Sequence, residues 1–445
     1  MFRSANVFQL ILCLVLFPVL VALPAFGDSC ITSLCHQDIG GLKYLHQPIK
    51  DGDCLSCHHR KSKEHPTGGG KSFELTAKGA ALCSQCHDPF GKKKVVHPPC
   101  RDGGCTDCHK PHGAANRFLL DVGADQSELC LGCHDAAPFK RKYLHGPAAV
   151  GECTRCHDPH ESGEKRLLKG PVRTICLKCH QDFARALKAA KSGHPPVQEG
   201  PCTLCHDPHG ADVPPVLRKK MPGLCVDCHK NMADKVTGVK VPHKPLQQEG
   251  SCGNCHAAHY SDARGLLPTD EMSMCLGCHG RDGLGSPPLR NIKKELAKKK
   301  YLHGPIGKGE CSGCHNPHGS NFFRMLRGNY PSDYYAPYKP GMYDACMICH
   351  DKTMLAVPET TSATKFRNGG RNLHFLHISN RKGRSCRACH EPHAADGPKL
   401  TAAEGTRFGA WKIPFRLTIT TTGGRCSSGC HKSLDYDRVK PVAYK

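Results

Sequence analysis

The sequence predicts a mostly irregular chain with short α-helices and little β-structure, arranged as an elongated array of repeats around covalently bound groups. Two observations predict this class. The 445 residues include 32 Cys and 31 His but only 15 Phe, 11 Tyr and one Trp, too few large apolar side chains for the core of so long a chain. The 46 Gly and 34 Pro favour loops and turns over long helices or strands.

Residues 1–27 have the composition of a removed signal peptide. Arg3 precedes an apolar run from Val7 to about Leu23, and Ala25 and Gly27 place small residues where a signal peptidase cuts. The alternative is a retained anchor helix, because the run approaches the length that spans a bilayer. No membrane span is expected in the mature chain, and we expect export to the periplasm, the outer membrane or the extracellular side.

Thirty of the cysteines form fifteen pairs, each followed directly by a histidine. Two thiols at this spacing add across the vinyl groups of one haem, and the adjacent histidine binds its iron as proximal ligand. Zinc ribbons and thiol oxidoreductases use similar pairs, but neither requires a histidine after every second cysteine. The pattern therefore predicts about fifteen covalent haem c groups with their iron.

Thirteen pairs have the regular spacing Cys-x-x-Cys-His, and they comprise Cys54, Cys57 and His58; Cys83, Cys86 and His87; Cys105, Cys108 and His109; Cys130, Cys133 and His134; Cys153, Cys156 and His157; Cys176, Cys179 and His180; Cys202, Cys205 and His206; Cys225, Cys228 and His229; Cys252, Cys255 and His256; Cys275, Cys278 and His279; Cys311, Cys314 and His315; Cys346, Cys349 and His350; and Cys386, Cys389 and His390. Two pairs with wider spacing end the series: Cys30, Cys35 and His36, and Cys426, Cys430 and His431. Two cysteines are left over, Cys13 in the predicted signal peptide and Cys100. For Cys100 a free thiol, an intermolecular disulfide and an alternative attachment cysteine stay open, and we interpret it as structural.

The other histidines recur in register with the motifs. One set precedes the first cysteine of a motif by eight or nine residues: His46, His97, His145, His194, His243, His303 and His377. A second set follows a proximal histidine by three residues: His112, His160, His209, His259, His318 and His393. This recurrence predicts distal axial ligands, and hence bis-histidine irons with no open position. A histidine only three residues past a proximal one cannot reach the opposite face of that haem, so we expect it to bind another. The first repeat lacks this histidine, and His65 or His59 must substitute.

The spacing divides the chain into consecutive two-haem repeats. We expect a signal peptide at 1–27, an N-terminal segment with the first motif at 28–45, and repeats at 46–96, 97–144, 145–193, 194–242, 243–302, 303–373 and 374–445, the last two enlarged by insertions. Within them, 182–191 and 293–300 are predicted to be helical. The strongest strand signal is Phe415–Thr422.

The string Cys153-Thr-Arg-Cys-His-Asp-Pro-His160 carries a more specific pattern, CxxCHxPH. In this pattern, and in the doubling of its motifs over about 30–431, the chain resembles the bacterial paired CXXCH-motif multihaem cytochromes c. The resemblance implies an elongated array organised around stacked haems, which carries electrons in anaerobic respiration or extracellular electron transfer. It also implies redox partner proteins in the periplasm or outer membrane and an extracellular electron acceptor.

The formal net charge of +23 would suggest a nucleic-acid partner in another protein. Export argues against one, and the haem propionates supply the counter-charges for the lysines. We therefore expect an electron-transfer protein with no catalytic residues. Two alternatives stay open. A multihaem oxidoreductase would need one iron with an open site, and a conduit or filament subunit would need contacts that the sequence does not reveal.

Overall fold

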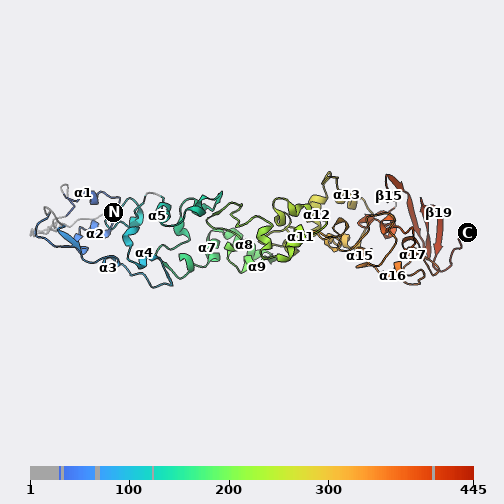
Figure 1. Ribbon diagram of the computed structural model, residues 1–445, viewed down its shortest axis with the longest axis horizontal. Coiled ribbons are helices and arrows are strands. Elements are labelled where there is room, and N and C mark those ends of the chain that lie inside the picture. The colour runs from blue at the N-terminus through green and yellow to red at the C-terminus, as the bar shows by residue number, and fades with distance from the viewer. Residues whose placement is uncertain (1–29, 32–34, 66–70, 123–124, 403–405, 445) are drawn as a thin grey trace, which may run out of the picture. The chain divides into compact units, whose positions relative to one another are not determined.

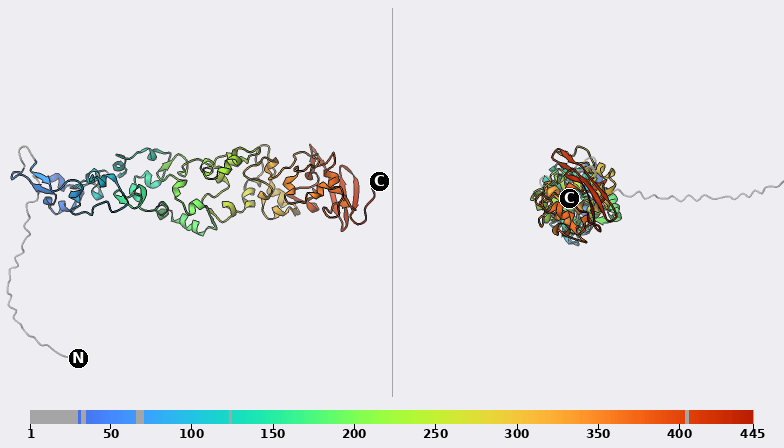
Figure 2. Two further views of the ribbon diagram at one scale, coloured as in Figure 1. Left: turned by 60° about the horizontal axis from the view of Figure 1, so that its bottom comes forward. Right: turned by 90° about the vertical axis from the view of Figure 1, so that its right-hand side faces the viewer.

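The computed structural model describes residues 30–31, 35–65, 71–122, 125–402 and 406–444 (Figure 1). The predicted signal peptide lies outside these residues. Short helices and brief strand pairs joined by loops make up the described chain (Figure 2), which confirms the predicted class. The chain divides into two compact units: one holds the residues up to Ala136 together with Val150–Gly170, and the other holds Ala137–Ala149 and Pro171–Lys445.

Except in the seventh repeat, where His377 lies inside α17 (Leu373–Ile378), each repeat begins with a histidine at the N-cap of a one-turn helix. Proline follows the histidine directly or after one residue, and its fixed φ suits the first turn of a helix. His97, for example, is extended (φ −64°, ψ 131°) and precedes α4 (Pro98–Arg101). The same turn recurs as α2 (Gln47–Lys50), α6 (Gly146–Ala149), α9 (Pro195–Gln198), α14 (Gly304–Gly307) and the 3-10 helix η9 (Lys244–Gln247).

The attachment motifs lie on short helices because Cys-x-x-Cys-His spans one helical turn. The amide of His109 donates to the carbonyl of Cys105 over 3.0 Å, so the imidazole emerges beside the first thiol. First motifs lie on the 3-10 helices η1 (Cys54–Ser56), η2 (Cys105–Asp107), η5 (Cys153–Arg155), η7 (Cys202–Leu204), η10 (Ser251–Asn254), η12 (Cys311–Gly313) and η14 (Cys386–Ala388). Second motifs lie on or beside α3 (Ala80–Cys83), α5 (Ser127–Leu131), α7 (Val172–Cys179), α10 (Gly223–Val226), α12 (Glu271–His279) and α15 (Asp344–Met347).

A two-residue antiparallel ladder joins each repeat to the next. The strand before the cap histidine of one repeat pairs with the strand after the first motif of the following repeat. The ladders are β1 (Tyr44–Leu45) with β5 (Gly113–Ala114), β4 (Val95–Val96) with β7 (Glu161–Ser162), β6 (Tyr143–Leu144) with β9 (Gly210–Ala211), β8 (Ser192–Gly193) with β10 (Tyr260–Ser261), and β11 (Tyr301–Leu302) with β14 (Ala394–Ala395). At one junction a single bridge between Val241 and Ser320 replaces the ladder. The backbones approach closely: a Cβ on Gly113 would lie 2.7 Å from the Tyr44 carbonyl oxygen.

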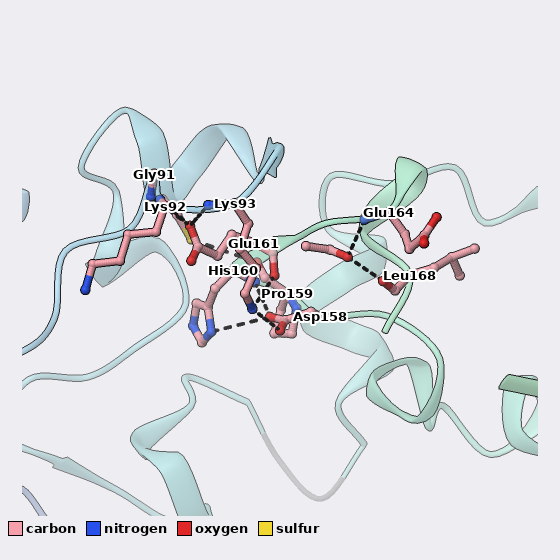
Figure 3. A network of polar contacts seen from close by, with 11 residues as sticks. Gly91, Lys92, Lys93, Asp158, Pro159, His160, Glu161, Glu164 and Leu168 are labelled. Atoms are coloured by element: carbon pink, nitrogen blue, oxygen red, sulfur yellow. Dashed lines mark hydrogen bonds and ion pairs between the residues drawn. The ribbon is translucent and has the colours of Figure 1, made fainter. Parts of the chain in front are cut away.

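A carboxylate reinforces these junctions (Figure 3). Glu161 is buried, and its Oε2 accepts the consecutive backbone amides of Gly91, Lys92 and Lys93 at 2.8, 3.1 and 3.3 Å. Successive amides of this kind form an anion-binding nest. The bond from the Gly91 amide is the main cause of the lowered pKa of Glu161. Lys93 also pairs with Asp158 at 3.7 Å. Part of the excess of lysine therefore holds neighbouring repeats together.

The remaining elements fill the segments between motifs. The predicted helices are present as α8 (Gln181–Ala189) and α13 (Ile292–Ala297). The others are α1 (Gln37–Gly40), η4 (Ala137–Lys140), η8 (Lys230–Met232), α11 (Ala233–Thr237), α16 (Thr353–Ala356) and α17 (Leu373–Ile378), with the hairpins β2 (His58–Arg60) with β3 (Phe73–Leu75) and β12 (Arg367–Asn368) with β13 (Arg371–Asn372).

The C-terminal residues form the largest sheet of the described chain. β17 (Phe415–Ile419), β18 (Gly423–Ser428) and β19 (His431–Asp437) are antiparallel in that order, and β15 (Thr406–Phe408) pairs with β16 (Trp411–Ile413). β17 is the strand predicted from Phe415. The last attachment motif therefore lies on a β-hairpin, with Cys426 in β18 and His431 at the start of β19.

A conventional apolar core is confined to the segment before this sheet. Tyr330, Ala336, Tyr343, Leu355 and Ile378 form the buried cluster. In the described part of the first compact unit, by contrast, Ala114 is the one hydrophobic residue that is fully buried. Small domains without an apolar core need another source of stability, such as a covalent cofactor.

Candidate haem-binding sites

The histidines of the repeats lie in facing pairs. In one set, the cap histidine of a repeat faces the proximal histidine of the second motif in the same repeat. The pairs, with ring-centre distances, are His46 with His87 (5.9 Å), His97 with His134 (6.0 Å), His145 with His180 (6.2 Å), His194 with His229 (6.0 Å), His243 with His279 (6.2 Å), His303 with His350 (6.1 Å) and His377 with His431 (6.4 Å).

In the other set, the histidine three residues past a proximal histidine faces the first motif of the preceding repeat. These pairs are His58 with His112 (6.2 Å), His109 with His160 (5.9 Å), His206 with His259 (6.0 Å), His256 with His318 (6.1 Å) and His315 with His393 (6.2 Å). The ring of each trailing histidine thus lies opposite a proximal histidine of a different motif. His209 holds the same position in the sequence of its repeat.

These distances fit an iron between each pair of rings. Two metal–nitrogen bonds of about 2 Å, with each ring centre roughly 1 Å behind its ligating nitrogen, put the centres about 6 Å apart. The described pairs span 5.9 to 6.4 Å, too far for direct stacking and matched to a bis-imidazole iron. The residues present therefore fit haem c, with a thiol pair beside one ring of each site.

The two ends of the array use histidines outside the repeat register. His65 lies 5.9 Å from His36, so of the two candidates left open by the sequence it is His65 that faces the first motif. His59 instead lies half exposed, 3.8 Å from a carboxylate oxygen of Glu74. His390 has no following repeat, and His374 faces it at 6.4 Å.

Sequence reasoning did not select His374. Its signal was available, because the register leaves His390 without a partner and His374 lies one helical turn before His377. Both histidines extend from α17. Burial, together with the charges of His390 and His377, lowers the pKa of His374 to about 4, so this imidazole is neutral at physiological pH. The neutral ring is the form that ligates a metal.

In six of the seven repeats a strained turn orients the proximal histidine of the first motif. Its Nδ1 hydrogen-bonds a backbone carbonyl nine residues later: His109 to Phe118 (2.8 Å), His157 to Arg166 (2.9 Å), His206 to Pro215 (3.1 Å), His256 to Gly265 (2.8 Å), His315 to Arg324 (3.0 Å) and His390 to Lys399 (3.0 Å). Several of these carbonyls belong to non-glycine residues with left-handed backbone, including Phe118 (φ 69°), Arg166 (φ 58°) and Lys399 (φ 58°). Such conformations persist where the surrounding structure enforces them, and here they fix the ring and its tautomer.

The CHxPH segment orients a second kind of histidine. The carbonyl of its proline, or of the alanine that replaces it, lies within hydrogen-bond distance of the Nδ1 of the preceding repeat's cap histidine: Pro159 with His97 (2.9 Å), Pro208 with His145 (3.1 Å), Ala258 with His194 (3.1 Å) and Pro317 with His243 (2.8 Å). One short segment therefore supplies a proximal histidine, a facing histidine for one neighbouring site and an orienting carbonyl for another. These three roles explain why the two histidines of the segment keep a separation of three residues.

The attachment thiols of consecutive motifs lie against each other. The first cysteines of successive motifs lie close enough to influence each other's pKa across each repeat junction described: Cys30 with Cys54, Cys83 with Cys105, Cys130 with Cys153, Cys176 with Cys202, Cys225 with Cys252, Cys275 with Cys311, and Cys346 with Cys386. Within a repeat, the second cysteine of the first motif interacts with the charge of a cysteine in the second motif, as Cys108 does with Cys133. Cys100 lies near this series, where burial, reinforced by Cys105 and Cys108, raises the pKa of its thiol to about 11.

These sites define a protein that holds many haem groups covalently and in close succession. A model of the doubled CXXCH motif matches residues 46–92, 97–139, 145–185, 194–234, 243–284, 303–355 and 377–408. The chain therefore belongs to the doubled CXXCH motif family and is a multihaem c-type cytochrome, a class that transfers electrons.

A stretch of 118 residues is 28% identical to the multihaem cytochrome MtrA of Shewanella baltica (strain OS185), covering 25% of this chain and 33% of that protein. The chain thus spans about a third of the length of this curated relative. Among the residues that the structure describes, no helix is both long and apolar enough to cross a membrane.

Proposed function

We propose that this protein is an exported electron carrier that conducts along a chain of about fifteen bis-histidine haems. When bound, haem c supplies reversible one-electron redox chemistry at its iron. The polypeptide's part is to place the attachment points in succession, to cap both faces of every iron and to hold the ligand rings in fixed orientations.

The contact between thiols of successive motifs is the observation that carries this proposal. A haem would be bound through both of its vinyl groups. Cysteines that lie close together across a junction would therefore hold the attachment points of two haems near each other. Cys275 with Cys311 is one example, and Cys130 with Cys153 is another. Contacts of this kind recur in chain order within each compact unit, which supports a continuous conductor rather than a set of isolated centres.

The facing rings support closed irons. We assign the proximal ligands to the motif histidines and the distal ligands to the histidines that face them, including His65 and His374 at the ends. With these assignments fourteen of the fifteen motifs have their own second histidine among the facing pairs, which favours conduction over the alternative of a multihaem reductase with an open site.

Location and partners follow from the same features. The apolar N-terminal segment and the covalent haems support export to the periplasm or the outer membrane. Redox proteins of those compartments, and through them an extracellular acceptor, are the proposed partners.

Intact mass combined with ferric EPR tests the proposal. We expect fifteen haem masses on the exported chain and low-spin signals throughout. A double variant, Cys426→Ser with Cys430→Ser, should carry one haem fewer, and it is the control for the hairpin motif. Thirteen haems would remove both wide-spaced motifs from the array, and a high-spin signal in the parent protein would support the reductase.

A further inference from the structure

The segment after each second motif covers the distal histidine of a site further along the chain. Phe90 stacks on His160 with ring centres 4.7 Å apart. Phe139 lies 5.3 Å from His209, and Phe183 lies 5.1 Å from His259. In these three repeats an aromatic ring therefore shields the outer side of the distal imidazole.

The corresponding segment after His279 supplies a carboxylate instead. Glu295 extends from α13, its side chain is only about 10% exposed, and its Oε1 lies 3.7 Å from the Nδ1 of His393. Both atoms are buried, and His393 Nδ1 makes no hydrogen bond within the described residues, whereas Glu295 Oε1 also faces the guanidinium of Arg290. Buried polar atoms that face each other without a bond are costly, so a slight rotation that joins them is favoured.

Guanidinium and carboxylate groups surround this site. Arg290 lies 2.6 Å from Glu295 and 3.4 Å from Glu391, and Arg324 and Arg387 add positive charge nearby. Of the two carboxylates it is Glu295 that faces the His393 ring. The His393 ring is also turned, since it makes an angle of 45° with His315. The corresponding angles are 17° for His109 with His160 and 20° for His206 with His259.

We infer that Glu295 is a positioning residue that accepts a hydrogen bond from His393 Nδ1 and makes the haem between His315 and His393 more reducing than its counterparts. A carboxylate on the outer nitrogen raises the basicity of a ligating imidazole, and a nearby negative charge stabilises the ferric state. At two equivalent sites the nearest carboxylate is more exposed, because Asp158, 4.0 Å from His160, is 29% exposed and Asp207, 3.9 Å from His209, is 41% exposed. Solvent therefore screens their charges more than that of Glu295. The reduction potentials along the array are therefore not all alike, because the haem between His315 and His393, near the C-terminal end, has a lower potential. The inference rests on the proposed function, since it takes His315 and His393 as the two ligands of one iron.

Redox titration of the fully loaded, full-length chain tests the inference. Glu295→Gln keeps the shape and removes the charge, and Glu295→Asp keeps the charge on a shorter stem. Asp282→Asn is the matched control: Asp282 pairs with Lys294 of the same helix, and its removal takes away one carboxylate without touching the histidine.

In the Gln variant we expect one haem to become easier to reduce, with its reduced-to-oxidised ratio at fixed potential rising about tenfold, or about 59 mV for a one-electron couple. Its ferric EPR component should shift as the ring turns. The Asp variant should stay nearer the parent, and the control should not move.

An unchanged Gln variant, or an equal shift in the Asp282 control, would overturn the role of Glu295. Failure of the proposed function looks different. A missing haem mass at the Cys311 motif, or a high-spin iron there in the parent protein, would show that the two histidines do not share an iron.

Discussion

Asn372 is the residue whose loss we expect to damage two haem sites together. Its side chain is 1% exposed. The Oδ1 accepts the amides of His374 and Phe375 at 3.0 and 3.2 Å and so caps α17. The Nδ2 donates to the carbonyls of Met354 and Val357 at 2.9 and 2.8 Å. Because α17 holds both His374 and His377, this one amide positions both distal histidines of the last repeat.

The cost of Asn372→Ala follows from these four bonds. Loss of an N-cap costs about 1 kcal/mol, and each buried carbonyl left without its donor costs about 1–3 kcal/mol. The total of roughly 3–7 kcal/mol is a large part of the stability of an ordinary domain. We therefore expect α17 to detach before the rest of the molecule unfolds.

Denaturant titration followed by ferric EPR measures this effect. Asn372→Ala should produce high-spin iron at the His390 and His431 motifs at lower denaturant than in the parent protein. Asn372→Asp keeps the capping oxygen but loses both donors. Its high-spin iron should therefore appear at a denaturant concentration between those of Asn372→Ala and the parent protein. Asn380→Ala is the control, because that exposed side chain donates only to the Leu376 carbonyl. The reasoning is refuted if Asn372→Ala keeps the parental midpoint and stays low-spin.

Three further predictions concern other parts of the molecule. His374→Ala should open one iron and add a high-spin component to the ferric EPR spectrum, whereas His59→Ala should leave the spectrum unchanged; equal effects would contradict the assignment. Arg166→Gly should raise the denaturant midpoint of the first compact unit by the equivalent of up to about 1 kcal/mol, since glycine adopts φ 58° without strain; a lower midpoint would argue against strain. A bond from Thr422, reinforced by backbone amides, lowers the pKa of Asp437 to about 2. The C-terminal sheet should therefore gain stability from this carboxylate above about pH 4 and lose it as pH falls towards 2. Acid unfolding monitored by circular dichroism should begin at higher pH in Thr422→Val, and an unchanged acid limb would contradict this.

The class of fold and the set of histidines that recur with the motifs could be predicted because both follow from spacing. A cysteine pair with its histidine spans one helical turn, and a histidine three residues later cannot turn back to the same iron. The sequence therefore predicts that His160 serves a different haem from His157, but only the structure shows that it lies opposite His109. For the histidine missing from the first repeat, the sequence limited the choice to His59 and His65.

Other features depend on contacts between distant segments, and no local pattern reports them. The left-handed backbone at Arg166 could not be predicted because the position is not a glycine. The strand pairs are too short to show an alternation of polar and apolar residues. His374 lies outside the repeated positions, so the spacing of the motifs does not show that it faces His390. Glu295 is one acidic residue in a lysine-rich helix, and only the folded chain shows that it faces His393.

The sharing of each CHxPH segment between neighbouring sites has a consequence for the order of assembly. The site built on His109 is complete only when His160, in the next repeat, has been made and exported. An iron at a first motif must therefore wait for a segment about fifty or more residues behind its own attachment point, whereas the histidine that faces a second motif, such as His97 opposite His134, has already been made. At His390 the facing histidine, His374, also lies earlier in the chain, so this site needs no later segment.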